Sequence, residues 1–124
     1  MPKKVSIRTG VPGETAAERR VLADISSTGA EPVLKSDGVL VSRNEYIHLF
    51  FEVTDDAGTG ITFTVQLWWY SPISGEWHIG EQMNVNSNDV NTVEVQGLNR
   101  LFAQVTNVSG TGSLNMWLGL VIPV

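Results

Sequence analysis

Alternation of apolar and polar residues is the dominant pattern of the chain from about residue 38 onward. In residues 46–53 the apolar side chains that share one face are Ile47, Leu49, Phe51 and Val53. Residues 61–70 alternate in the same way. Successive side chains of a strand point to opposite faces, so each run predicts a strand with one buried face. Further strands are predicted at residues 76–83, 92–96, 100–108 and 113–122, with a shorter one at residues 39–42.

Turn-forming residues separate these strands at short, regular intervals, at residues 54–60, 74–75 and 109–112. Joining neighbouring strands across these turns predicts three hairpins, with Trp77 and Ile79 facing inward. Several hairpins with matching apolar faces can close a core. We therefore predict an all-β chain: a single antiparallel β-sandwich, jelly-roll or Ig-like, with six to eight strands.

The N-terminal part of the sequence follows a different pattern. We expect residues 1–37 to form an extended arm or appendage and residues 38–124 to form the sandwich. Thr15 and Glu18 fit a capping box, and apolar residues follow at helical spacing, which predicts one short helix at residues 16–25. The alternative is a short strand at residues 21–25. Residues 5–8 could form an edge strand.

Charge and composition narrow the possible partners. The net charge is −5 with a pI near 4.8, and the chain lacks the basic stripe typical of nucleic-acid binders. Cysteine is absent, which excludes disulfides, thiolate catalysis and cysteine zinc sites. No apolar run approaches the roughly 20 residues that span a bilayer, and the start does not lead into a signal-peptide core. We expect a soluble protein that binds neither nucleic acid nor membrane.

No catalytic or metal-binding motif emerges from the polar residues. His48 and His78 lie on predicted strands without a metal-ligand spacing, and the serines lack a nucleophile-elbow motif. Two loops are rich in side-chain oxygens, but turn formation accounts for them better than calcium binding. These oxygen-bearing residues are Asp55, Asp56, Asn84, Asn86, Asn88 and Asp89. We expect no enzyme activity, no metal and no cofactor.

Five aromatic residues alternate onto the second face of their strands: Tyr46, Phe50, Trp68, Tyr70 and Trp117. Large exposed apolar patches usually mark contacts. The N-terminal segment could cover these rings, another subunit could pack on them, or they could form a platform on which sugar rings stack. For the sugar platform, nearby Gln66, Gln104 and Asn115 could supply hydrogen bonds.

The C-terminal half resembles a known group of proteins. Residues 100–112 read Arg-Leu-Phe-Ala-Gln-Val-Thr-Asn-Val-Ser-Gly-Thr-Gly and lead into Leu114-Asn-Met-Trp117. This segment resembles the final strands of small β-sandwich virion proteins of tailed bacteriophages. The stretch from Ile61 to Trp77, which ends Ser-Pro-Ile-Ser-Gly-Glu-Trp, is similar to their preceding hairpin.

The resemblance implies a head decoration (cement) protein or a related capsid or tail protein, located on the outer capsid surface or the tail. Its expected partner is the major capsid protein or another virion protein, and we expect a homo-oligomer, with a trimer favoured. An N-terminal arm that clamps neighbouring subunits is also implied. The alternative function is a carbohydrate-binding module on a fibre or beside an enzyme, which would bind a glycan through the aromatic platform.

Overall fold

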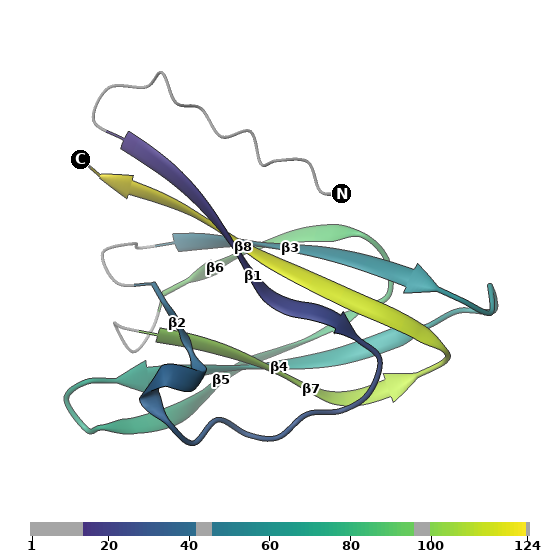
Figure 1. Ribbon diagram of the computed structural model, residues 1–124, viewed down its shortest axis with the longest axis horizontal. Coiled ribbons are helices and arrows are strands. Elements are labelled where there is room, and N and C mark those ends of the chain that lie inside the picture. The colour runs from purple at the N-terminus through teal and green to yellow at the C-terminus, as the bar shows by residue number, and fades with distance from the viewer. Residues whose placement is uncertain (1–13, 42–45, 96–99, 124) are drawn as a thin grey trace.

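Eight antiparallel strands form two four-stranded sheets in a computed structural model of the chain, which describes residues 14–41, 46–95 and 100–123 (Figure 1). Sheet A has the strand order β1 (Glu14–Ile25), β8 (Gly112–Pro123), β3 (Tyr46–Asp55) and β6 (Asp89–Glu94). Sheet B has the order β2 (Val39–Leu40), β7 (Arg100–Ser109), β4 (Thr62–Ser71) and β5 (Glu76–Val85). The predicted all-β sandwich is confirmed.

The strand order distinguishes between the two predicted types of sandwich. β1 pairs with β8, β2 with β7, β3 with β6 and β4 with β5, so the chain resembles one long antiparallel ribbon folded at the β4–β5 turn. Two further pairings, β3 with β8 and β4 with β7, close this ribbon into two layers. This is the jelly-roll arrangement of a two-sheet, eight-stranded domain.

The core lies between the two sheets and is built by the alternating rows that the sequence predicted. Ile47, Leu49 and Phe51 line the inner face of sheet A, and Phe63 and Trp69 line that of sheet B. All are nearly inaccessible to solvent. Burying such side chains stabilises the fold by roughly 1.5–3 kcal/mol each.

Two of the predicted hairpins are wrong. β3 lies in sheet A and β4 in sheet B, so the loop between them crosses from one layer to the other, and the same holds for β7 and β8. Only the β4–β5 hairpin is confirmed among the three. Period-2 alternation identifies a strand and its buried face, but both sheets bury an identical kind of face, so alternation does not select the partner strand.

The predicted helix at residues 16–25 is also wrong, because β1 is an edge strand that pairs with β8 over most of its length. Its pairing with β8 is irregular between Arg20 and Leu22 and again between Leu22 and Ile25. Each irregularity shifts the phase of the side chains. Val21, Leu22 and Ile25 therefore all pack against the core at a spacing that imitates a helix.

Residues 26–38, here called the strap, connect β1 to β2 and run along sheet B (Figure 1). The strap contains one short 3-10 helix, η1 (Lys35–Asp37). The predicted arm of residues 1–37 thus includes a sheet strand and this strap, and the predicted strand at residues 5–8 lies outside the described residues. Within the described part of the chain, no helix has the length and apolar character needed to cross a membrane.

Candidate functional site

The five outward-facing aromatic residues lie on two opposite faces of the sandwich. Tyr46, Phe50 and Trp117 belong to β3 and β8 and lie on the outer face of sheet A. Trp68 and Tyr70 belong to β4 and lie on the outer face of sheet B. The sequence placed all five on one second face. That grouping fails because β3 and β4 enter different sheets.

A transverse row of side chains crosses all four strands of sheet A. Arg20 on β1 lies opposite Trp117 on β8, Trp117 lies opposite Phe50 on β3, and Phe50 lies opposite Val90 on β6. Directly opposed side chains on neighbouring strands contact one another. We call these four residues the aromatic row.

Gly119 leaves room for the Phe50 ring on the surface of sheet A. A Cβ atom added to Gly119 would come within 2.9 Å of the Phe50 ring carbon Cε2. The Phe50 ring also lies near His48, with 6.4 Å between ring centroids. Phe50 is therefore fixed in the sheet surface, and its outward part stays available for contact.

A polar cluster holds the β1 end of the aromatic row. The Arg20 guanidinium lies over the Trp117 ring at 5.0 Å from its centroid and donates a hydrogen bond to Asn115 Oδ1. Asn115 Oδ1 also accepts from the Asp24 backbone N–H at 2.8 Å, and its Nδ2 donates to Asp24 Oδ1 at 3.2 Å. Asn115 is 95% buried. Charge-assisted hydrogen bonds to a buried amide fix the orientation of Arg20, whose guanidinium lies over Trp117.

The β6 end of the aromatic row is apolar and open to solvent. Val90 is 52% exposed, and Tyr46, on the same face, is 56% exposed. His48, which lies between Tyr46 and Phe50 on β3, shares a 2.9 Å hydrogen bond with Thr92 Oγ1. The β6 half of this face is therefore apolar and exposed, whereas the β1 half carries the polar Arg20 cluster. Protein interfaces have a similar composition, with an apolar core and a polar rim.

The outer face of sheet B is largely occupied by contacts within the chain. The Trp68 indole N–H donates to Gln104 Oε1 at 2.9 Å, and Gln104 Nε2 donates to the Gly29 carbonyl at 3.1 Å. Tyr70 lies edge-on to Trp77, with 5.3 Å between ring centroids. The strap therefore covers part of this face, as one of the three explanations for the aromatic residues anticipated.

Trp77 and Ile79 were predicted to face inward, and both predictions are wrong. Trp77 packs on the outer face, where its indole N–H donates to the Leu34 carbonyl of the strap at 3.2 Å. Ile79 lies opposite Trp68 and is 65% exposed. The β4–β5 pairing is irregular between Gln66 and Trp68, which shifts β5 out of the phase that simple alternation predicts.

The three amides considered for sugar binding are engaged within the fold. Gln66 is buried, and its Nε2 lies within hydrogen-bond distance of three carbonyls, those of Leu67, Gly80 and Glu81. Gln104 and Asn115 hold the strap and the Arg20 cluster. None of the three projects freely beside an aromatic ring.

Side chains of the polar loops accept hydrogen bonds from backbone N–H groups. Asp55 accepts backbone hydrogen bonds from Gly58 at 3.0 Å and Gly60 at 2.7 Å, and Asn88 Oδ1 accepts from Val53 at 2.8 Å. His78 Nε2 lies 3.0 Å from Ser74 Oγ within the β4–β5 turn. Among the described residues, no group of three His, Asp or Glu side chains has the geometry to hold a metal ion.

Sequence reasoning missed Arg20 and Val90, the two ends of the aromatic row. Val90 lies in β6, which begins at Asp89, three residues before the predicted start at Thr92. Arg20 lies in the segment assigned to a helix. Neither residue carries a local signal that relates it to Phe50 or Trp117, because the relation exists only through the pairings of β1 with β8 and of β3 with β6.

Comparison with known proteins identifies a similar fold. The chain superposes on the crystal structure of the SPBc2 prophage-derived protein YomS with a TM-score of 0.64 and 11% sequence identity, covering 92% of this chain and 99% of that one. A second structure, PirA, gives a TM-score of only 0.38 at 9% identity, covering 95% of this chain and 99% of PirA. No family model and no curated protein sequence matches the chain. The likeness to YomS therefore concerns the fold alone.

Proposed function

We propose that this chain is a non-enzymatic structural protein of a bacteriophage particle, acting through protein–protein contacts as a capsid decoration (cement) protein. The observation that carries the proposal is the outer face of sheet A, where a fixed aromatic row continues into exposed apolar side chains. The jelly-roll topology, shared in outline with a prophage-derived protein, supports a phage setting.

The contact face combines rigidity with apolar area. Phe50 and Trp117 are fixed by Gly119 and by the Arg20–Asn115–Asp24 cluster, so little side-chain freedom is lost on association. Burying apolar area at such a face contributes about 25 cal/mol per Å². On a symmetric shell, many modest contacts of this kind add up to a strong overall attachment.

The glycan-binding alternative depends on an open, flat aromatic platform. The five rings lie on two faces, the guanidinium of Arg20 lies over Trp117, and the flanking amides are already hydrogen-bonded within the fold. These features favour a protein contact. Binding of the intact chain on a glycan array, lost in Trp68→Ala or Trp117→Ala, would instead support the module.

A charge placed on the exposed end of the face tests the proposal. We expect Val90→Lys to weaken attachment to phage particles, or to their purified major capsid protein, by about 100-fold, because a lysine buried at an interface core loses its hydration. The free energy of unfolding should change by no more than about 0.5 kcal/mol. Co-sedimentation with particles and urea denaturation measure the two quantities.

Ile79→Lys is the matched control, since Ile79 is also an exposed apolar residue, 65% against 52% for Val90, but lies on the opposite sheet. It should attach like the unmodified chain. Loss of attachment in Ile79→Lys together with full attachment of Val90→Lys would assign the contact to sheet B and overturn the sheet A assignment.

A further inference from the structure

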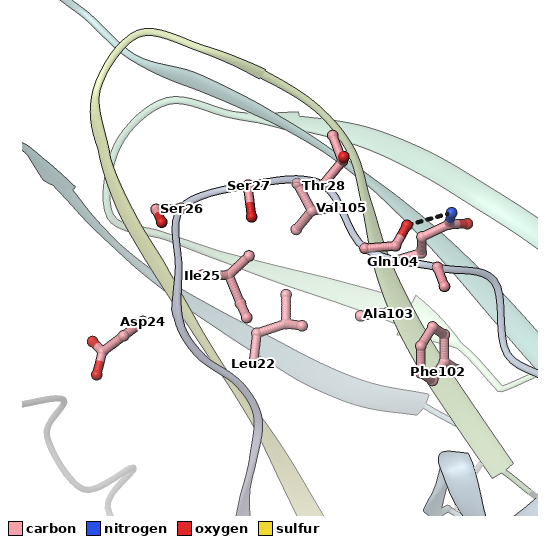
Figure 2. Close-up of a pocket in the computed structure, with 12 residues that line it drawn as sticks. Leu22, Asp24, Ile25, Ser26, Ser27, Thr28, Phe102, Ala103, Gln104 and Val105 are labelled. Carbon is pink, nitrogen blue, oxygen red and sulfur yellow. Dashed lines mark hydrogen bonds between the residues drawn. The ribbon is translucent and has the colours of Figure 1, made fainter.

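A pocket of about 330 Å³ lies where β1 of sheet A approaches β7 of sheet B, beside the strap (Figure 2). Leu22 and Ile25 of β1 and Ala103 of β7 lie around its centre. Leu22 and Ile25 pack against the core, so this side of the pocket is apolar. The strap forms another side with residues 26–28, Ser-Ser-Thr, all of which are exposed. We call this space the seam pocket.

The edge of β7 has an unpaired residue beside the seam pocket. β7 has ten residues, whereas β2 has two, which pair with Arg100 and Leu101. Farther along β7, the Val105 carbonyl accepts a hydrogen bond from the Gly29 N–H of the strap at 2.9 Å. Backbone groups of alternate residues in a strand point to the same edge, so the N–H and C=O of Ala103 also point away from β4 and toward the strap. Among the described residues, neither β2 nor the strap donates a backbone hydrogen bond to Ala103 or accepts one from it.

These two groups of Ala103 are shielded from bulk water, since the residue is only 3% exposed. A buried backbone N–H or C=O without a partner costs free energy, and a molecule that supplies the partner recovers that cost. The seam pocket therefore offers a donor and an acceptor side by side, next to an apolar wall and a row of hydroxyl groups.

The surroundings of the seam pocket exclude several kinds of ligand. An added peptide strand would pair with alternate residues of β7, but Leu101 and Val105 are already taken by β2 and by the strap. An anion is disfavoured, because Asp24 is the one charged residue among the described residues that line the pocket. A plain hydrocarbon would leave both backbone groups of Ala103 unpaired. What fits is a small neutral molecule with an acceptor, a donor and a short apolar group.

We propose that the seam pocket binds an N-acetylated amino sugar, an N-acetylhexosamine. Such a ring carries an acetamido carbonyl, which accepts from the Ala103 N–H, beside a hydroxyl that donates to the Ala103 carbonyl. The acetyl methyl group then lies against Leu22 and Ile25, and further ring hydroxyls face Ser27 and Thr28. Ligand pockets have volumes of roughly 300–1,000 Å³ and combine an apolar lining with a few polar groups that fix orientation. A single sugar ring suits the lower end of this range.

This inference goes beyond the proposed function and does not rest on it. The proposed particle contact uses the outer face of sheet A, whereas the seam pocket lies between β1, the strap and β7. It also differs from the aromatic sugar platform, because none of the five outward-facing aromatic residues is among its described lining residues. Failure of either site leaves the other standing.

NMR titration of the isotope-labelled, full-length chain tests the site with two matched pairs of sugars. The methyl β-glycosides of N-acetylglucosamine and N-acetylgalactosamine are compared with those of glucose and galactose, which have a hydroxyl in place of the acetamido group. We expect at least one N-acetylated glycoside to shift the Ala103 amide signal. Its unacetylated counterpart should bind at least about tenfold more weakly, because the buried N–H then stays unpaired. No shift of Ala103 with either N-acetylated glycoside, or equal affinities within both pairs, would overturn the proposal.

Removal of the strap hydroxyls gives a second measurement. In a chain carrying both Ser27→Ala and Thr28→Val, the affinity for the N-acetylated glycoside should fall at least about fivefold, because two hydrogen bonds to the sugar are lost. Ser87→Ala is the matched control, since Ser87 is an exposed serine in the β5–β6 loop, at the opposite side of the sandwich. It should bind like the unmodified chain. Unchanged affinity in the double variant would place the sugar elsewhere and remove this site.

A short peptide mimic, N-acetylalanine N-methylamide, separates the sugar from a peptide that carries the same acetamido group. It lacks ring hydroxyls, so we expect it to bind about tenfold more weakly than the N-acetylated glycoside. Equal or tighter binding of the peptide mimic, with the same shift of the Ala103 amide, would assign the seam pocket to a peptide and overturn the sugar.

Discussion

Individual residues in this fold are constrained chiefly by how closely the strands approach one another. Gly112 begins β8 where the chain passes next to the end of β3, and an added Cβ would lie 1.9 Å from the Thr54 carbonyl oxygen. Asp37 sits at the end of η1 and accepts backbone hydrogen bonds from Val33 and Leu34. A side chain at position 112 would clash with the backbone, whereas position 37 requires a carboxylate that accepts hydrogen bonds. Substitutions at the two positions should therefore have different effects.

Gly112→Ala should lower the free energy of unfolding by about 3 kcal/mol, because the clash is with a backbone atom that cannot rotate away. Gly29→Ala is the control, since a Cβ there meets nothing within 4 Å. It should leave stability unchanged or raise it by up to about 1 kcal/mol, because alanine lowers the entropy of the unfolded chain. Urea denaturation of both variants measures the difference, and equal stabilities would contradict the close approach of β8 and β3.

Asp37 should make the strap sensitive to acid. Hydrogen bonds from the backbone N–H groups of Val33 and then Leu34 hold the pKa of Asp37 below its ordinary value of 3.8. A depressed pKa means that the stabilisation is fully present above pH 3.8 and is lost as the pH falls through the lowered pKa. NMR shifts of the Val33 and Leu34 amides should therefore titrate below pH 3.8 and lose this transition in Asp37→Ala. A midpoint above 3.8 would contradict the capping contact.

At the scale of elements, β1 is an integral strand of sheet A. It pairs with β8 from Glu14 to Ile25, and Val21, Leu22 and Ile25 pack against the core. The strap that follows it holds Trp77 and Gln104 on the other sheet. An N-terminal boundary at residue 37 would therefore cut through the structural unit and not between an arm and a domain.

Two truncations separate the arm from the sheet. Removal of residues 1–13 should leave a folded chain, because β1 begins at Glu14. Removal of residues 1–25 should expose the edge of β8 and the margin of the core, and an unprotected edge strand promotes aggregation. Circular dichroism and size-exclusion chromatography measure the outcome. A soluble, folded chain lacking residues 1–25 would show that β1 is dispensable.

For the whole molecule, the sequence was sufficient to identify an all-β sandwich and most of its core. The rows through Ile47 and Phe63 are buried as alternation predicted, because a strand with one covered face must place every second side chain inside. The outward position of Tyr46, Phe50, Trp68, Tyr70 and Trp117 follows from the same alternation. Absence of cysteine and an acidic charge were equally plain from the sequence.

Tertiary structure alone decided which strands are neighbours. It separated the five aromatic residues onto two faces and joined Arg20 and Val90 to Phe50 and Trp117. It also left a pocket lined by residues of β1, the strap and β7. The physical reason is that strand pairing joins residues far apart in the chain, and it depends on the fit of the two layers rather than on any local pattern. An irregular pairing between β4 and β5 then shifts the side-chain phase of β5, which placed Trp77 on the outer face and not on the inner face that alternation predicted.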